Sequence, residues 1–266
     1  PVIMIAFLKL IRLPNLLIIA FTQYMIRLCL IEPSLHLYGL YLQISDIEFA
    51  LLVLATVFIA AGGYVINDYF DYLSGTDNIN LTPTPFSGGS RVIQEGALSP
   101  RALLLGGALF IAIGSIIGVY LAFLKGFPVL ALGVIGVFLA VGYIHPKINL
   151  SKKGLGELSV AIAFGPIMLS GVYYVQAQAI DLEIILIGCV MGLLAGSVLW
   201  LNEIPDYEAD KVTGKTNWVV RLGKKRASYT YVALLVLIYL LTFILLAKNI
   251  LPKSSSIVFF TLILAF

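Results

Sequence analysis

The chain has 266 residues, of which 60% are hydrophobic and only 12% charged, with a formal net charge of +3 and a mean hydropathy of +1.01. Soluble domains have an apolar share nearer ~45–50%, so this composition excludes a soluble domain or an attached soluble module. We therefore expect one domain over residues 1–266, embedded in a lipid bilayer and without a nucleic-acid partner.

Apolar stretches of about 20 residues recur along the chain, and each is long enough to cross a hydrocarbon core of ~30 Å. The sequence predicts an all-α, polytopic transmembrane bundle with about eight visible helices. They lie at 12–31, 47–66, 102–124, 128–144, 156–176, 182–204, 228–247 and, in part, from 255. The last run is cut short at Phe266, from which we expect a truncated C-terminus.

An acidic motif closes the second predicted helix. It contains Asn67, Asp68 and Asp71, and Asp77 follows in the next loop. If the helix continues through the motif, Asn67 and Asp68 each lie about one turn from Asp71, and the three side chains point into one region. Arg91, further along the loop, offers a fork for phosphate oxygens. The plain alternative is a polar cap on a spanning helix, followed by a solvated loop.

A second motif of the same design closes the sixth predicted helix. Asn202, Asp206 and Asp210 follow one another at intervals of four residues, so they line one stripe unless Pro205 kinks the helix. Carboxylates beside a bilayer are costly and are functional candidates by default. Oxygen ligands of this kind suit Mg²⁺, which usually bridges to substrate phosphates. The two motifs together predict a metal-diphosphate site at a membrane surface.

Basic residues set the expected orientation. With loops on alternating sides, 13 of the 17 Lys and Arg residues fall on the side of both motifs, which should be cytoplasmic. We expect an integral protein of the cell inner (plasma) membrane with its site facing the cytoplasm. On the same side, Lys147 could neutralise a diphosphate oxygen, or it could serve only as a topology signal.

The two motifs resemble those of the UbiA family of integral-membrane prenyltransferases, and the likeness extends over nearly the whole chain. The family pattern has an acid where this chain has Gly75, and the next acid is Asp77. This departure is similar to the subgroup that prenylates 1,4-dihydroxy-2-naphthoate in menaquinone synthesis. Segments 89–94, 154–157, 164–166, 202–210, 214–215 and 220–223 also resemble that subgroup. The family has nine helices, so the end of the eighth and all of the ninth would be missing here.

The resemblance implies Mg²⁺-dependent transfer of a polyprenyl group from polyprenyl diphosphate to 1,4-dihydroxy-2-naphthoate, with loss of CO2 to give demethylmenaquinone. It implies catalytic roles for Asp71, Asp206, Lys147 and Arg91; diphosphate contacts from Arg91, Lys147, Asn67, Asn202 and Lys211; and metal ligands at Asn67, Asp68, Asp71, Asp77, Asp206 and Asp210.

Two other interpretations stay open. A family member could instead use 4-hydroxybenzoate, homogentisate or a glycerol-phosphate lipid precursor as the acceptor. A divalent-cation transporter would also place acids in a membrane bundle, but transporters usually carry their site near the bilayer midplane on broken helices. The acids here lie at helix ends on one side, which favours an enzyme.

Overall fold

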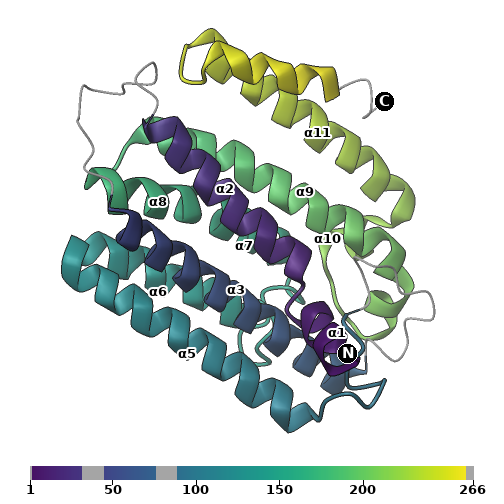
Figure 1. Ribbon diagram of the computed structural model, residues 1–266. Helices are drawn as coiled ribbons and strands as arrows, with labels where there is room; N and C mark the ends of the chain where they lie inside the picture. The colour runs from purple at the N-terminus through teal and green to yellow at the C-terminus, as the bar shows by residue number, and fades with distance from the viewer. Residues whose placement is uncertain (1, 32–44, 76–88, 262–266) are drawn as a thin grey trace.

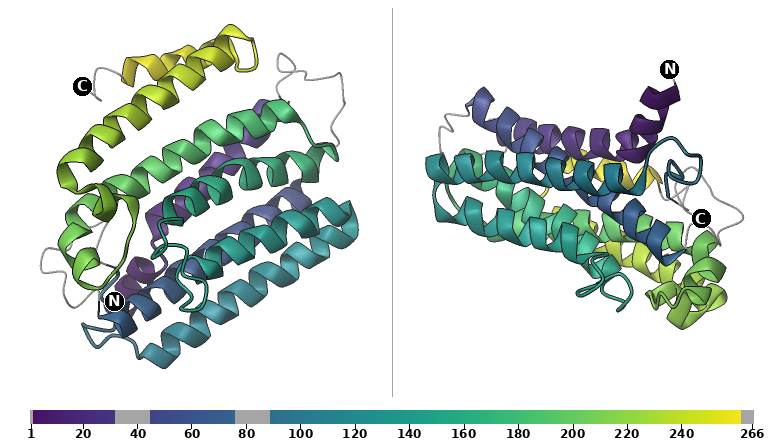
Figure 2. Two further views of the ribbon diagram at one scale, coloured as in Figure 1. Left: turned by 180° about the vertical axis from the view of Figure 1, so that it is seen from behind. Right: turned by 90° about the horizontal axis from the view of Figure 1, so that it is seen from below.

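The computed structural model describes residues 2–31, 45–75 and 89–261, which form a bundle of helices running roughly along a common direction (Figures 1 and 2). The first half contains α1 (Val2–Leu10), α2 (Leu13–Ile31), α3 (Asp46–Ser74), α5 (Pro100–Lys125) and α6 (Phe127–Gly142). The second half contains α7 (Gly156–Ile162), η2 (Ala163–Ile167), α8 (Met168–Ala177), α9 (Leu182–Val212), α10 (Trp218–Leu222), α11 (Lys224–Ala247) and η3 (Lys253–Thr261). The described residues contain no strand, which confirms the predicted all-α class.

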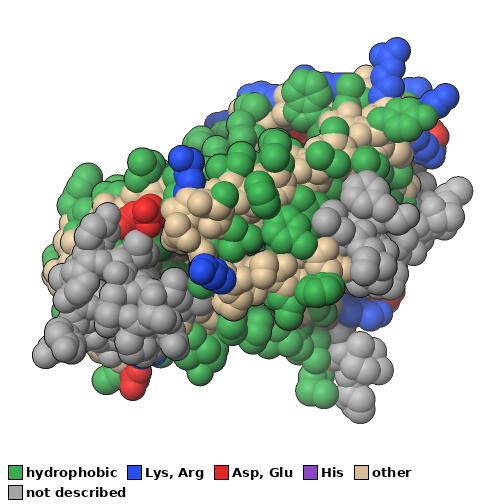
Figure 3. Space-filling view, turned by 90° about the horizontal axis from the view of Figure 1, so that it is seen from above, with side chains coloured by type: hydrophobic (Ala, Val, Ile, Leu, Met, Phe, Trp, Pro, Cys, Tyr) green, Lys and Arg blue, Asp and Glu red, His purple; other side chains and the backbone are tan. Residues whose placement is uncertain are grey.

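Five spans in the described part of the chain are long and apolar enough to cross a membrane: α3, α5, the continuous α7–η2–α8 segment, α9 and α11. Two apolar helices, over Leu13–Leu28 and Phe127–Gly142, are shorter. Hydrophobic side chains cover much of the outer face seen in Figure 3. Apolar surface of this extent suits lipid rather than water, so the chain is an integral membrane protein.

Local sequence signals fix the helix ends. Ser45 caps α3 by accepting a hydrogen bond from the Glu48 N–H, and Ser99 caps α5 in the same way just before Pro100. Gly75 ends α3 in the left-handed region, with φ of 77°. As a result, α3 runs through the first acidic motif, eight residues beyond the predicted end at 66, so the condition for the predicted side-chain spacing is met.

Glycine allows the second half to pack closely. A Cβ on Gly192 of α9 would lie 2.1 Å from the Ala161 carbonyl oxygen, and one on Gly165 would lie 2.3 Å from the Gly188 carbonyl oxygen. The backbones of α9 and the α7–η2 segment therefore touch. Around Pro166 the segment adopts a π-helical turn, a feature often found next to functional sites.

The predicted helices differ from the structure in several places: the second continues to Ser74 instead of ending at 66, the seventh begins at Lys224, and α1 was not predicted. Residues Lys253–Thr261, where a partial eighth helix was predicted from 255, form the 3₁₀ helix η3, which folds back against α11 (Figure 1). The predicted sixth helix, 182–204, is longer, because α9 continues to Val212 with Pro205 inside it. The second acidic motif therefore lies within a helix.

Candidate active site

A cavity of about 1130 Å³ lies between α2, α3, α6, the α7–η2–α8 segment and α9. One end is polar and contains residues of both acidic motifs, whereas the remainder is mainly apolar. At the opposite end of the bundle, two ion pairs, Arg27–Asp46 and Lys125–Glu48, join α2 to α3 and α5 to α3. The cavity itself therefore has one polar, charged end and a mainly apolar remainder.

The first motif contributes two of its side chains to the cavity. Asn67 and Asp71 both line it, and the Asn67 amide donates a 2.8 Å hydrogen bond to Asp71 Oδ2. This pairing matches their predicted positions one turn apart. Asp71 is buried, so its charge needs partners inside the protein.

Asp68, predicted as a metal ligand beside Asp71, has a different position. It is 3% exposed and is not among the described residues that line the cavity. Its Oδ1 lies 3.2 Å from Arg12 Nη2, and its Oδ2 accepts a 3.0 Å hydrogen bond from the Ser90 N–H. The physical reason is helical geometry: Asp68 is turned about 100° from Asn67 and faces the start of α2. Asp68 thus holds Arg12 and the loop at Ser90 in place.

Arg12 sits at the junction of α1 and α2 with a left-handed φ of 51°. Its guanidinium stacks on the Tyr64 ring at 5.2 Å and lines the cavity. Burial opposes its charge, but the Asp68 carboxylate together with Tyr64 and Asp71 outweighs that effect and raises the pKa of Arg12. A permanent positive charge is therefore fixed beside the first motif.

The second motif faces the first across the cavity. Asn202, Asp206 and Asp210 of α9 all line it, which agrees with the predicted stripe. Asp210 is buried, and its Oδ2 accepts a 2.8 Å hydrogen bond from the Asn217 amide. Asn217 also caps α10 by accepting from the Val220 N–H, so it fixes the return loop to α9.

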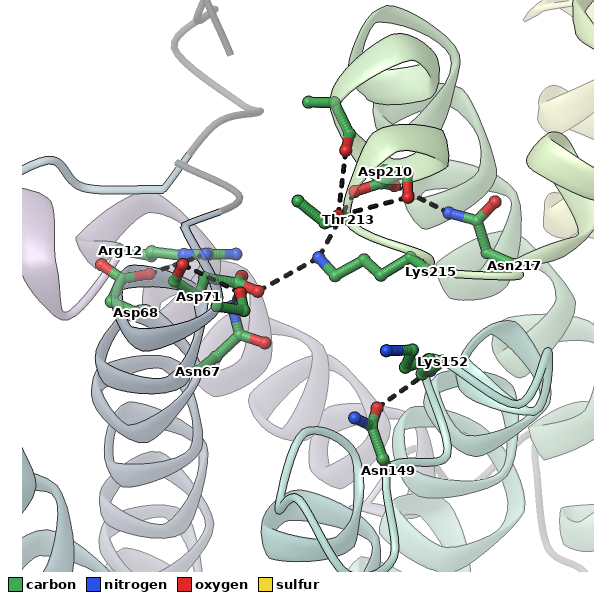
Figure 4. A network of polar contacts seen from close by, with 12 residues as sticks. Arg12, Asn67, Asp68, Asp71, Asn149, Lys152, Asp210, Thr213, Lys215 and Asn217 are labelled. Atoms are coloured by element: carbon green, nitrogen blue, oxygen red, sulfur yellow. Dashed lines mark hydrogen bonds and ion pairs between the residues drawn. The ribbon is translucent and has the colours of Figure 1, made fainter. Parts of the chain in front are cut away.

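Lys215 joins the two motifs (Figure 4). Its ammonium nitrogen lies 3.2 Å from Asp71 Oδ1 and 3.5 Å from Asp210 Oδ1. Burial alone would lower the pKa of Lys215, but the two carboxylates outweigh it and raise the pKa above its ordinary value. Asp71 and Asp210 are 139 residues apart in the sequence. Lys215 contacts both, so the two motifs lie side by side in the fold.

The predicted basic contacts divide into two groups. Arg91, with φ of 59°, lines the cavity beside the first motif. Lys147 is exposed in the loop after α6, and Lys211 is exposed on α9 against the Tyr207 ring; neither is among the described cavity-lining residues. Asp77 lies outside the described residues. Arg91 is therefore the predicted basic residue that reaches the cavity.

Sequence reasoning missed Arg12, Lys215, Asn217 and Glu203 as site residues. Lys215 could have been found from the sequence, because it is a basic residue in the Gly-Lys-Thr-Asn loop that directly follows the second acidic motif. Arg12 carried no comparable signal, because its partner Asp68 is 56 residues away.

The oxygen donors of the site suit a hard divalent cation. Carboxylate and amide oxygens come from Asn67, Asp71, Asp206 and Asp210, and none of these donors is sulfur or imidazole. No three acidic, His or Cys side chains of the described ranges gather closely enough to enclose a metal by themselves. Mg²⁺ fits such an incomplete set, because it keeps waters and takes substrate phosphates as further ligands.

Comparison with known proteins identifies the family of this chain. The sequence model of the UbiA prenyltransferase family matches residues 37–266. The chain is 33% identical over 201 residues to the 1,4-dihydroxy-2-naphthoate octaprenyltransferase of Mycobacterium tuberculosis, and 32% identical over 185 residues to that of Haemophilus influenzae. These matches cover 74% and 67% of this chain but only 66% and 58% of the relatives, so it spans less than two thirds of their length.

A solved structure of a UbiA homologue from Archaeoglobus fulgidus, bound to GPP and Mg²⁺, has the same fold. The TM-score is 0.70 at 18% identity, and the match covers 97% of this chain and 85% of that one. A structure of digeranylgeranylglyceryl phosphate synthase matches with a TM-score of 0.64 at 19% identity, over 97% of this chain and 82% of that one. From its sequence match and its fold, the chain belongs to the UbiA prenyltransferase family.

Proposed function

We propose that this chain carries the site for transfer of a polyprenyl group from polyprenyl diphosphate to 1,4-dihydroxy-2-naphthoate, with loss of CO2. The observation that carries the proposal is one cavity with the two acidic motifs at its polar end and an apolar remainder. A prenyl diphosphate has the same two parts, a charged head and a long apolar tail. The acceptor is the one named for the relatives from M. tuberculosis and H. influenzae.

The diphosphate binds at the polar end in this mechanism. Arg91 and Arg12 line that end from one side and Lys215 from the other, so positive charge is already in place where the leaving group gains negative charge. Asn67, Asp71, Asp206 and Asp210 would hold Mg²⁺, which when bound neutralises charge on the departing diphosphate. Asp68 supports this set indirectly, because it holds Arg12.

The tail extends into the apolar part of the cavity. Leu52, Leu121, Val129 and Val175 line its far region, near the opposite end of the bundle. Apolar walls keep water away from the allylic carbon as its bond to oxygen breaks, so the electron-rich ring of the acceptor attacks it instead. We place the site on the cytoplasmic side of the inner membrane, because most basic residues lie at that end.

The test is a prenyl-transfer assay in membranes, with and without Mg²⁺, in which 1,4-dihydroxy-2-naphthoate and 4-hydroxybenzoate compete for one polyprenyl diphosphate. The expected result is demethylmenaquinol, the reduced form, which is recovered as demethylmenaquinone after oxidation in air, with release of CO2 and diphosphate and only when Mg²⁺ is present. Product from 4-hydroxybenzoate alone would keep prenyl transfer and overturn the acceptor. No product from either, with folded protein, would overturn the proposed function.

A further inference from the structure

Two loops beside the second acidic motif are joined by one arginine side chain. The first loop, between α6 and α7, contains Lys152 and Lys153, and the second, between α9 and α10, contains Thr216. Arg221 of α10 donates a 2.6 Å hydrogen bond from Nε to the Thr216 carbonyl oxygen and a 2.7 Å bond from Nη2 to the Lys153 carbonyl oxygen. The N–H and the hydroxyl of Thr216 both donate to the Lys152 carbonyl oxygen. We call this set of bonds the Arg221 clasp.

Gly154 leaves room for the guanidinium of Arg221. It is buried, its φ is 74°, and a Cβ at this position would lie 2.8 Å from Arg221 Cζ and 2.9 Å from Nη2. The same guanidinium lies 5.3 Å from the centre of the Trp218 ring, and the Trp218 N–H donates a 2.9 Å hydrogen bond to Glu157. A left-handed φ favours glycine, and here the close contact requires it as well. The backbone of the first loop is therefore shaped to accept the arginine.

The fork of the arginine side chain explains why this residue type is used. Nε and Nη2 lie on one edge of a planar group, so they bind two carbonyl oxygens at once, one from each loop. Lysine ends in a single nitrogen and has no such edge. Arg221 is exposed and is not among the described residues that line the cavity, so it acts on the site through the residues that it holds.

Thr216 lies directly between two residues that do line the cavity, Lys215 and Asn217. The Lys215 N–H donates a 2.9 Å hydrogen bond to the Asp210 carbonyl oxygen, and the Asn217 amide donates to the Asp210 carboxylate, so this short segment is fixed to α9. The clasp fixes the same segment to the loop after α6 as well. The Lys215 ammonium thereby stays 3.2 Å from Asp71 and 3.5 Å from Asp210. A misplacement of about 1 Å at a site of this kind can cost about a hundredfold in rate.

We propose that Arg221 is a positioning residue for Lys215: the clasp holds segment 215–217 so that the Lys215 ammonium stays at the polar end of the cavity, where the diphosphate binds. This inference rests on the proposed function and names a residue outside the cavity on which diphosphate binding depends. Without the clasp, the segment keeps its bonds to α9 but is no longer held to the loop after α6. The ammonium then occupies its place for a smaller share of the time, and the apparent affinity falls by that share.

Calorimetric titration of the protein with geranyl diphosphate in detergent, at saturating Mg²⁺, measures this loss directly. If Arg221→Ala leaves the ammonium in place about a tenth of the time, the dissociation constant rises by about tenfold. Arg221→Lys has one nitrogen for the two carbonyl oxygens, so its dissociation constant should lie between those of wild type and Arg221→Ala. Arg226→Ala is the matched control, because Arg226 is an exposed arginine outside the clasp, and its loss should change the constant by less than about twofold.

Gly154→Ala tests the same contact from the other loop. Its Cβ would push the guanidinium away from the two carbonyl oxygens, so the dissociation constant should rise about as much as in Arg221→Ala. The two changes together should do no more than either alone, because they break the same contact. Gly96→Ala is the control for backbone strain, since Gly96 has a similar φ of 69° and nothing within 4 Å of the added Cβ. The constant of Gly96→Ala should stay close to that of wild type.

A double-mutant cycle separates the positioning of Lys215 from a general loss of structure. In the Lys215→Met background, Arg221→Ala should weaken binding by less than about twofold, because the ammonium that it positions is gone. Hydrogen exchange adds a measurement that does not depend on the Lys215→Met variant. The peptide that contains residues 213–217 should exchange about tenfold faster in Arg221→Ala than in wild type, whereas peptides of α11 should exchange at an unchanged rate.

The outcomes distinguish the inference from the proposed function. Unchanged binding in Arg221→Ala, or unchanged exchange of the 213–217 peptide, overturns the inference and leaves the proposed function intact. An effect of Arg221→Ala that is as large in the Lys215→Met background as in wild type overturns the inference too. A wild-type chain that does not bind geranyl diphosphate overturns both, whereas one that binds it but prenylates no phenolic acceptor overturns the proposed function alone.

Discussion

Lys215→Met tests whether the ammonium bridge holds the two acidic motifs together. The Lys215 nitrogen lies 3.2 Å from Asp71 and 3.5 Å from Asp210. At an effective dielectric constant of about 20, each contact is worth roughly 5 kcal/mol before desolvation is counted. Because removal leaves two buried carboxylates facing each other, we expect a net loss of about 3–5 kcal/mol in the free energy of unfolding.

The assay is thermal unfolding in detergent, followed with and without Mg²⁺. A loss of this size corresponds to a decrease of roughly 10 °C in the apparent midpoint for a chain of this length. Added Mg²⁺ should recover more of the midpoint in the variant than in wild type, since a cation then replaces the ammonium between the carboxylates. Lys211→Met is the matched control; Lys211 is exposed four residues earlier, and its loss should change stability by no more than about 0.5 kcal/mol. Equal midpoints for Lys215→Met and Lys211→Met, in both conditions, would refute the bridging role.

The remaining predictions concern single side chains. Asp206→Ala should abolish prenyl transfer with the protein still folded, and substantial turnover in that variant would contradict its role. Arg91→Ala should raise the KM for prenyl diphosphate by about tenfold, as expected for a lost charged hydrogen bond. Lys147→Ala should change that KM by less than about twofold, because Lys147 is not among the described cavity-lining residues. Equal effects of the two variants would contradict the assignment of Arg91, and not Lys147, to the diphosphate. Gly192→Ala should destabilise the protein by about 1–3 kcal/mol in thermal unfolding, because its Cβ would meet backbone at 2.1 Å. Gly133→Ala has no neighbour within 4 Å and should stabilise slightly, so a loss there as large as at Gly192 would argue against packing as the cause.

The sequence predicted those features that depend on local patterns. Runs of apolar residues gave the helices, so the predicted 102–124 became Pro100–Lys125 with its Ser99 cap and Pro100 start. Helical spacing correctly brought Asn67 to Asp71 and put Asn202 and Asp210 on the cavity side of α9. Such features follow from one turn of helix and need no knowledge of the fold.

Features that depend on distant partners could not be predicted. Asp68 shares a motif with Asp71, yet its direction is set by Arg12, which only the folded bundle brings near. Lys147 was a reasonable candidate by charge, but the loop after α6 leaves it exposed. Spacing along one helix says which side chains share a face, and it says nothing of what lies opposite.

In both α3 and α9, the distance between the acidic residues near the two ends of the helix can be compared with the thickness of a bilayer. In α3, twenty residues separate Glu48 from Asp68, and in α9 twenty residues separate Glu183 from Glu203. At 1.5 Å per residue each interval spans about 30 Å, which equals the hydrocarbon thickness of an ordinary bilayer. The two longest helices therefore match the same membrane thickness. A thicker bilayer would draw carboxylates of one end or the other toward lipid, so hydrophobic mismatch would disturb the polar site before it disturbed the apolar bundle.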